Sequence, residues 1–189
     1  MLSRSVVDRH DWKLNPAVFQ GINSLWGPLQ VDLFVSRITK QTERFFSWKP
    51  DPLAEAVDAF KQSWMDFLGY ANPPWGLIGR CVQYTLQQGA TVVLITPLWP
   101  AQQPWYPALF PLLLDNPRLL PQDPDLLISP VGHTIPLPKK ANNLVAWFIS
   151  GDRTRCRNHR GSYFPLIGIM EKFNHKTLQF LMELSLIHI

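Results

Sequence analysis

The tetrapeptide Asn72-Pro73-Pro74-Trp75 combines residue types that can activate an aromatic exocyclic amine. The lone pair of such an amine is delocalised into its ring, so acceptors must draw on its two hydrogens before the nitrogen becomes a good nucleophile. The Asn72 side chain and the Pro73 carbonyl can supply rigidly held acceptors, and Trp75 offers a face for an extruded base. The motif therefore predicts group transfer to a nucleobase amine, although a Pro-Pro turn with a buried tryptophan is an equally good structural interpretation.

Two acids lie where a cofactor could be held. Asp32 closes a predicted strand, and Asp58 precedes the strand that leads to Asn72, where its carboxylate could accept from an adenine amine. For each, a solvated loop carboxylate is the alternative interpretation. The segment that follows Asp32 lacks the glycine that would let a backbone approach a cofactor closely.

The elements around the motif indicate a βαβ unit. Residues 67–71 form a predicted strand, residues 77–86 repeat apolar side chains at helical spacing before Gly89, and residues 91–97 are apolar without alternation. Such a run is typical of a strand buried on both faces of a parallel sheet. The sequence therefore predicts a three-layer α/β fold with an open, mostly parallel sheet.

Further elements extend this sheet on both sides of the motif. A helix is predicted from Pro16 to the stop at Gly27-Pro28. Residues 56–60 form a predicted strand, although residues 53–60 could equally form a turn of helix. The remaining predictions are strands at 29–34, 44–48, 118–120 and 126–128 and a helix within 105–114. Because ligands of open α/β sheets bind at the carboxyl ends of the strands, we expect Asp32, Asn72 and Trp75 to converge there.

Composition excludes several classes of protein. The chain has 189 residues, of which 46% are hydrophobic and 17% charged, enough for a core and against general disorder. Its 18 prolines argue against a helical bundle, and no apolar run approaches the length of a membrane span. Two cysteines and a charged first segment predict an intracellular protein of the cytoplasm or nucleus that does not bind membranes.

Other candidates for chemistry are weaker. The net charge of +4 is compatible with a nucleic-acid partner, and the arginines between Arg153 and Arg160 could contact phosphates or form a solvated tail. Trp99, Trp105 and Tyr106 could stack on bases or pack in the core. Cys81 falls on an apolar helix face and is assigned to the core, and the five scattered histidines predict no metal site.

Several motifs in a fixed order resemble one known family. The strings that carry the resemblance are Gly27-Pro28-Leu29-Gln30-Val31-Asp32-Leu33-Phe34-Val35-Ser36, Phe46-Ser47-Trp48-Lys49-Pro50-Asp51-Pro52, Ala56-Val57-Asp58-Ala59-Phe60 with Trp64, Leu94-Ile95-Thr96-Pro97-Leu98-Trp99-Pro100 and Pro104-Trp105-Tyr106-Pro107. Together they resemble the methyltransferase-like region in polyproteins of DIRS-type tyrosine-recombinase retrotransposons, which is similar to phage Dam-type adenine methyltransferases.

The resemblance implies a Rossmann-like methyltransferase fold, truncated here, that uses S-adenosylmethionine to methylate adenine in nucleic acid, with DNA favoured over RNA. It implies that Asn72, Pro73, Pro74 and Trp75 form the catalytic motif, and that Asp32, Phe34, Ser36 and Asp58 bind the cofactor. Val35 stands where the family prefers alanine.

The resemblance also implies neighbouring polyprotein domains. Residues 1–10 are assigned to the tail of a preceding ribonuclease H region, because Leu2-Ser3-Arg4 resembles the end of its closing signature. The methyltransferase-like domain is assigned to residues 11–138, and residues 139–183 to a basic linker outside the core toward a following region. Residues 184–189 resemble a translated sequencing adapter and are excluded from fold reasoning.

Two functions remain open on the sequence. One is an S-adenosylmethionine-dependent adenine-specific DNA methyltransferase, favoured by the intact tetrapeptide. The other is a catalytically silent nucleic-acid-binding or spacer module between ribonuclease H and recombinase, favoured by Val35 and the missing glycine loop.

Overall fold

The computed structural model describes residues 12–98, 104–129 and 143–156. Its helices are α1 (Pro16–Trp26), α2 (Ile78–Gln88) and α3 (Tyr106–Leu109), with 3-10 turns η1 (Ala59–Lys61), η2 (Trp75–Leu77) and η3 (Phe110–Leu112). Its strands are β1 (Lys13–Leu14), β2 (Val31–Val35), β3 (Arg44–Ser47), β4 (Ala56–Val57), β5 (Leu68–Ala71), β6 (Thr91–Pro97), β7 (Arg118–Leu119), β8 (Leu127–Ile128) and β9 (Leu144–Ser150).

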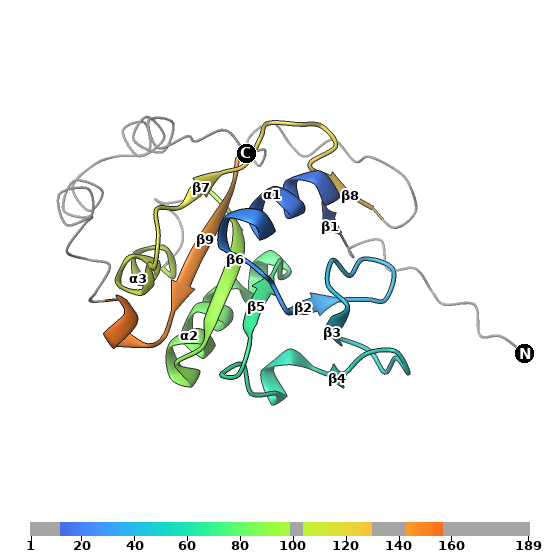
Figure 1. Cartoon of the computed structure of the whole chain (residues 1–189), viewed down its shortest axis with the longest axis horizontal. Coiled ribbons are helices and arrows are strands. Elements are labelled where there is room, and N and C mark those ends of the chain that lie inside the picture. Colours follow the sequence, from blue (N-terminus) through green and yellow to red (C-terminus); the bar gives the residue numbers. More distant parts are fainter. Residues whose placement is uncertain (1–11, 99–103, 130–142, 157–189) are drawn as a thin grey trace, which may run out of the picture.

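The main sheet confirms the predicted α/β class with a mostly parallel sheet. In the described part of the chain it has seven strands in the order β4-β3-β2-β5-β6-β9-β7. The strands from β4 to β6 pair in parallel, whereas β9 runs antiparallel to both β6 and β7. The carboxyl ends of β4, β3, β2, β5 and β6 therefore lie at one edge of the sheet, which we call the carboxyl edge (Figure 1).

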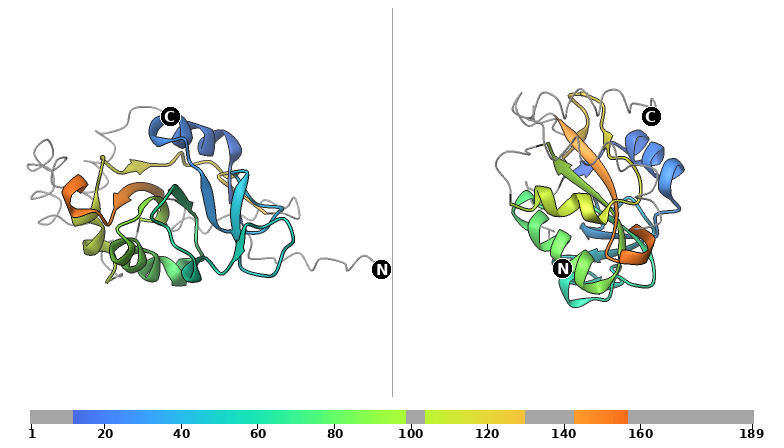
Figure 2. Two further views of the ribbon diagram at one scale, coloured as in Figure 1. Left: turned by 60° about the horizontal axis from the view of Figure 1, so that its bottom comes forward. Right: turned by 90° about the vertical axis from the view of Figure 1, so that its left-hand side faces the viewer.

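Helices cover both faces of this sheet. Figure 2 shows α1 on one side of the strands and α2 on the other. Side chains of β6 alternate accordingly, since Val92 and Leu94 belong to the core cluster shared with α2 and α3, whereas Val93 and Ile95 belong to the cluster shared with α1. The non-alternating apolar sequence of β6 thus reflects burial on two faces.

The two longer helices begin and end at the predicted signals. The Asn15 side chain accepts a hydrogen bond from the Ala17 amide, Pro16 opens α1, and Gly27 follows its last residue. Helix α2 ends at Gly89, whose φ of 65° is left-handed and disfavours any residue with a side chain. Both helix predictions are confirmed.

Strand β9 shows that the predicted domain boundary at residue 138 is wrong. Residues 144–150, assigned to a linker outside the core, form a strand between β6 and β7, and Trp147 is completely buried. The run from Leu144 to Ile149 is apolar without alternation, the same pattern as β6, because it is also covered on both faces. The polar and arginine-rich segments on either side hid this signal.

A second, two-stranded sheet holds the beginning of the described chain in place. β1 pairs antiparallel with β8, and the Asn15 amide donates to the Leu126 carbonyl over 2.8 Å. The predicted strand at 126–128 therefore exists but does not join the main sheet. No helix in the described ranges is long and apolar enough to cross a membrane.

Candidate functional site

The strand order of the sheet reverses between β2, which carries Asp32, and β5, which Asn72 follows. Numbered from β2 as the first parallel strand, the order runs 3-2-1-4-5, as in doubly wound sheets. The chain moves from β2 toward β3 on one side and from β5 toward β6 on the other, so a crevice is expected between the carboxyl ends of β2 and β5. Asn72 follows β5 directly at this point.

The Asn72 carboxamide has a described hydrogen-bond partner at Nδ2 but none at Oδ1. Its Nδ2 donates a long hydrogen bond of 3.4 Å to the carbonyl of Trp12. No described residue donates to its Oδ1 or to the carbonyl of Pro73, whereas the Pro74 carbonyl accepts from the Leu77 amide over 2.8 Å. Neither acceptor has a donor among the described residues, although Pro73 as a whole residue is buried.

Trp75 is not buried, contrary to the interpretation of the motif as a Pro-Pro turn around a core tryptophan. The residue begins η2, which leads into α2, and its side chain is 38% exposed. The two prolines lack a backbone N–H, so the motif joins neither the hydrogen-bond ladder of the sheet nor a helix before Trp75. An exposed aromatic ring in the same loop as Asn72 is consistent with stacking on a base.

Asp32 lies deeper than predicted. It is the second of the five residues of β2, so it does not close the strand, and it is completely buried beside Phe45 of β3 and Tyr70 of β5. Its Oδ2 accepts from the Gln41 amide over 3.0 Å. The solvated-loop interpretation is wrong for this acid, whose carboxylate ties the loop after β2 to the sheet.

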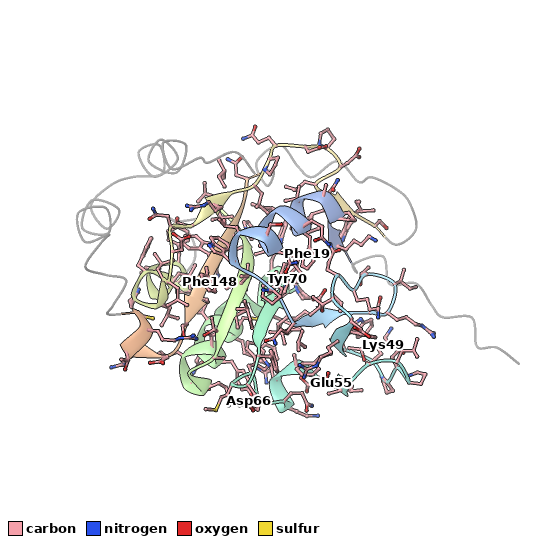
Figure 3. All side chains as sticks on the ribbon, viewed as in Figure 1. Phe19, Lys49, Glu55, Asp66, Tyr70 and Phe148 are labelled. Atoms are coloured by element: carbon pink, nitrogen blue, oxygen red, sulfur yellow. The ribbon has the colours of Figure 1, made fainter. Side chains whose placement is uncertain are left out.

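Tyr70 carries a buried hydroxyl for which no described residue is a hydrogen-bond partner. Its ring packs edge-on against Phe19 of α1 at 5.0 Å between centroids (Figure 3). Burial and the nearby Asp32 carboxylate raise the pKa of Tyr70 well above its ordinary value. An unsatisfied buried hydroxyl costs roughly 1–3 kcal/mol.

We therefore expect Tyr70→Phe to raise the free energy of unfolding by about 1–3 kcal/mol in urea denaturation at pH 7. The folded pKa is raised, so the parent loses stability as pH rises above the unfolded value of about 10, and Tyr70→Phe should lose less. A destabilised variant would mean that the hydroxyl has a partner.

Phe34 and Ser36 have mainly structural partners. The Phe34 ring contacts Phe60 at 5.2 Å and Trp64 at 5.9 Å on the α2 side of the sheet. The Ser36 carbonyl accepts from the Thr39 and Lys40 amides, which closes a tight turn without glycine. This turn replaces the glycine-rich loop that the sequence lacks.

Asp58 lies at the carboxyl end of β4. Its φ of 61° is left-handed, its amide donates to the Ser47 carbonyl over 2.8 Å, and its Oδ1 accepts from the Phe60 amide over 3.2 Å. Its Oδ2 is 3.5 Å from Lys61 Nζ. The carboxylate is thus held at the carboxyl edge by its own turn.

Sequence reasoning missed Trp48 as a site residue. This residue follows β3 beside the end of β4, is 49% exposed, and has the Lys49 ammonium 3.7 Å from its ring centroid. An aromatic residue directly after a parallel strand was the available signal. Trp48 and Asp58 therefore form a second group, separated from Asn72 by the width of the sheet from β4 to β5.

A cleft lined by described residues lies at the opposite edge of the sheet. It encloses about 590 Å³ between the beginnings of β5 and β6 and contains none of the predicted site residues. Asp66 and Phe148, both labelled in Figure 3, belong to its lining with Met65, Phe67, Leu68, Thr91, Leu114 and Arg155. This cleft is thus separate from the Asn72-Pro73-Pro74-Trp75 motif.

The weaker candidates are resolved where the structure describes them. Cys81 is buried, and burial raises the pKa of its thiol, so it belongs to the core as predicted. Trp105 and Tyr106 are also buried and pack in the core, whereas Trp99 lies outside the described residues. Arg153 and Arg155 are exposed, and the rest of the arginine cluster lies outside the described ranges. The described residues contain no group of three or more side chains suited to a metal ion.

No family model matches the chain, and no curated protein matches it.

Proposed function

We propose that this chain is a fragment of a retrotransposon polyprotein with a Rossmann-like methyltransferase fold, which transfers a methyl group from S-adenosylmethionine to adenine in DNA. The observation that carries the proposal is the pair of available acceptors, Asn72 Oδ1 and the Pro73 carbonyl, beside the exposed Trp75 at the carboxyl edge. The strand order 3-2-1-4-5 supports it, because ligands of such sheets bind where the order reverses.

The proposed chemistry concentrates on the amine nitrogen. Bound S-adenosylmethionine would supply an electrophilic methyl group on a sulfonium. Asn72 Oδ1 and the Pro73 carbonyl accept the two amine hydrogens, which draws the lone pair out of the ring and toward the methyl group. These hydrogen bonds strengthen as the nitrogen gains positive charge, so they stabilise the transition state more than the ground state. As the N–C bond forms, the S–C bond of the sulfonium would break with its electron pair left on sulfur, and one of the two amine protons would pass to solvent.

The groups at β3 and β4 suit the adenine of the cofactor. The Trp48 ring offers a stacking face, and the Asp58 carboxylate lies on the neighbouring strand as an acceptor for an exocyclic amine. Neighbouring strands lie about 4.8 Å apart, so β4 and β5 are separated by about 14 Å. That distance suits an elongated cofactor lying along the carboxyl edge with its reactive end toward Asn72.

We expect Asp58→Gly to weaken S-adenosylmethionine binding by roughly 1–3 kcal/mol, about 5- to 150-fold in Kd, in titration calorimetry of the full chain. Glycine removes the acceptor but accepts the positive φ of this position and costs little as a helix cap. The loss should appear in cofactor binding and leave turnover at saturating cofactor nearly unchanged.

Asp66→Gly is the matched control for this experiment. It also removes an exposed carboxylate, but from the opposite edge of the sheet, and should leave cofactor affinity unchanged. Equal affinities of Asp58→Gly and the parent would reject the adenine subsite.

A silent module that binds nucleic acid is the second candidate function. Two features at the carboxyl edge favour it. Val35 fills space at the end of β2 where the family has a smaller residue, and the Lys61 ammonium already pairs with the Asp58 carboxylate that the cofactor would use. A parent that folds and binds DNA but gives no heat with S-adenosylmethionine would establish this candidate instead.

A further inference from the structure

The segment of residues 12–15, here called the strap, crosses the carboxyl edge between the two loops that flank the reversal point. Gln41, from the loop after β2, donates through Nε2 to the Leu14 carbonyl. Asn72, from the loop after β5, donates through Nδ2 to the Trp12 carbonyl. The strap is anchored outside the main sheet, because Lys13 and Leu14 pair with Ile128 and Leu127 of β8 (Figure 1).

The contact with Trp12 decides which end of the Asn72 carboxamide is available. A carboxamide has a donor end and an acceptor end, and a backbone carbonyl can only accept. The Trp12 carbonyl therefore holds the NH2 end, and Oδ1 must point away from the strap. An amine substrate needs an acceptor, so this is the orientation that the proposed reaction requires.

We propose that the strap is a positioning element, in which the Trp12 carbonyl fixes the Asn72 carboxamide with Oδ1 toward the substrate amine. This inference rests on the proposed function. Trp12 acts here through its backbone and is a positioning residue, whereas Gln41 holds the strap at its other anchor.

The contact predicts that asparagine and aspartate are not interchangeable at position 72. Asn72→Asp keeps the shape and an acceptor for the amine, but it places a carboxylate oxygen against the Trp12 carbonyl in place of a donor. Two acceptors facing each other lose the hydrogen bond and repel, so the strap should open.

Hydrogen exchange of the strap in the full chain, followed by mass spectrometry, tests the contact itself. Exchange should be about fivefold faster than in the parent for Asn72→Asp and for Gln41→Met, each of which removes one donor. Gln83→Glu, which adds a charge on the exposed face of α2, is the control and should leave strap exchange unchanged. As pH falls, the introduced carboxyl group becomes protonated and can donate to the Trp12 carbonyl. The strap exchange rate of Asn72→Asp, divided by that of the parent at the same pH, should therefore approach one.

The kinetics of Gln41→Met test the positioning. A loosened strap should lower kcat for DNA methylation severalfold and leave KM for DNA unchanged, because substrate binding does not depend on this anchor. Unchanged strap exchange in both variants would overturn the inference about the strap but would leave the proposed function standing. Faster exchange with an unaltered kcat overturns the positioning role. A parent without methyl transfer rejects the proposed function and the positioning role with it.

Discussion

Replacing Asn72 with alanine should reduce methyl transfer to adenine by about 10²- to 10³-fold, the usual cost of removing one group that stabilises developing charge. The Asn72 Nδ2 donates to the Trp12 carbonyl, which leaves Oδ1 as the acceptor end. In the proposed reaction, the amine nitrogen that Oδ1 would contact gains positive charge. The loss should therefore fall on kcat, measured by labelled methyl transfer to unmethylated duplex and single-stranded DNA. Cofactor affinity by calorimetry should change by less than about twofold, since the adenine subsite that we propose is on β3 and β4.

Asn116→Ala is the control for this experiment, because this residue makes its described hydrogen bonds through its backbone and lies outside the carboxyl-edge loops. Its turnover should equal that of the parent. Full activity of Asn72→Ala would contradict the assignment of the tetrapeptide, and an inactive parent at saturating cofactor would contradict the enzyme proposal.

Local signals made much of the fold predictable. Pro16 and Gly89 act through the backbone, so their effects on helix ends can be deduced without knowing the neighbouring elements. The segment at 56–60 was ambiguous because it contains both predicted forms, the strand β4 followed by the turn η1. Its two-residue strand is too short for a periodic pattern.

The site was less predictable because its geometry depends on strand register and on distant contacts. Asp32 was placed at a strand end, but β2 continues to Val35, and only pairing with Tyr70 shows how deep the carboxylate lies. The contact between Asn72 and Trp12 joins residues 60 positions apart, beyond any local pattern. Trp48 had a local signal, but its relation to Asp58 depends on the pairing of β3 with β4.

The error at the domain boundary had a different cause. Residues 139–183 are basic on average, and the short apolar run at residues 144–149 was read together with its polar and arginine-rich flanks. Strand β9 gains its stability from the sheet, where it pairs along its whole length with β6. A seven-residue strand can therefore belong to the core even when its surroundings resemble a linker.

Trp147 provides the strongest test of this corrected boundary. Its side chain is completely buried, packs edge-on against Tyr106 at 5.5 Å and Phe110 at 6.1 Å, and donates from Nε1 to Thr96 Oγ1 over 2.9 Å. Trp147→Ala should lower the free energy of unfolding by about 3–5 kcal/mol, through lost burial and the cavity that remains. Domains are commonly stable by only about 5–15 kcal/mol, so this change should approach complete unfolding.

Urea denaturation of the full chain measures this loss, and Trp48→Ala is the matched control because that indole is 49% exposed. The control should lose less than about 1 kcal/mol. If Trp147→Ala does not fold, Trp147→Phe keeps part of the volume but loses the hydrogen bond to Thr96, and its free energy of unfolding should fall between those of the parent and the alanine variant.

A loss from Trp147→Ala as small as that of the control would mean that β9 is not docked and that the core ends near residue 138. The large loss is expected because β9 separates β6 from β7, so weakening it also removes the edge of the sheet against which α3 packs.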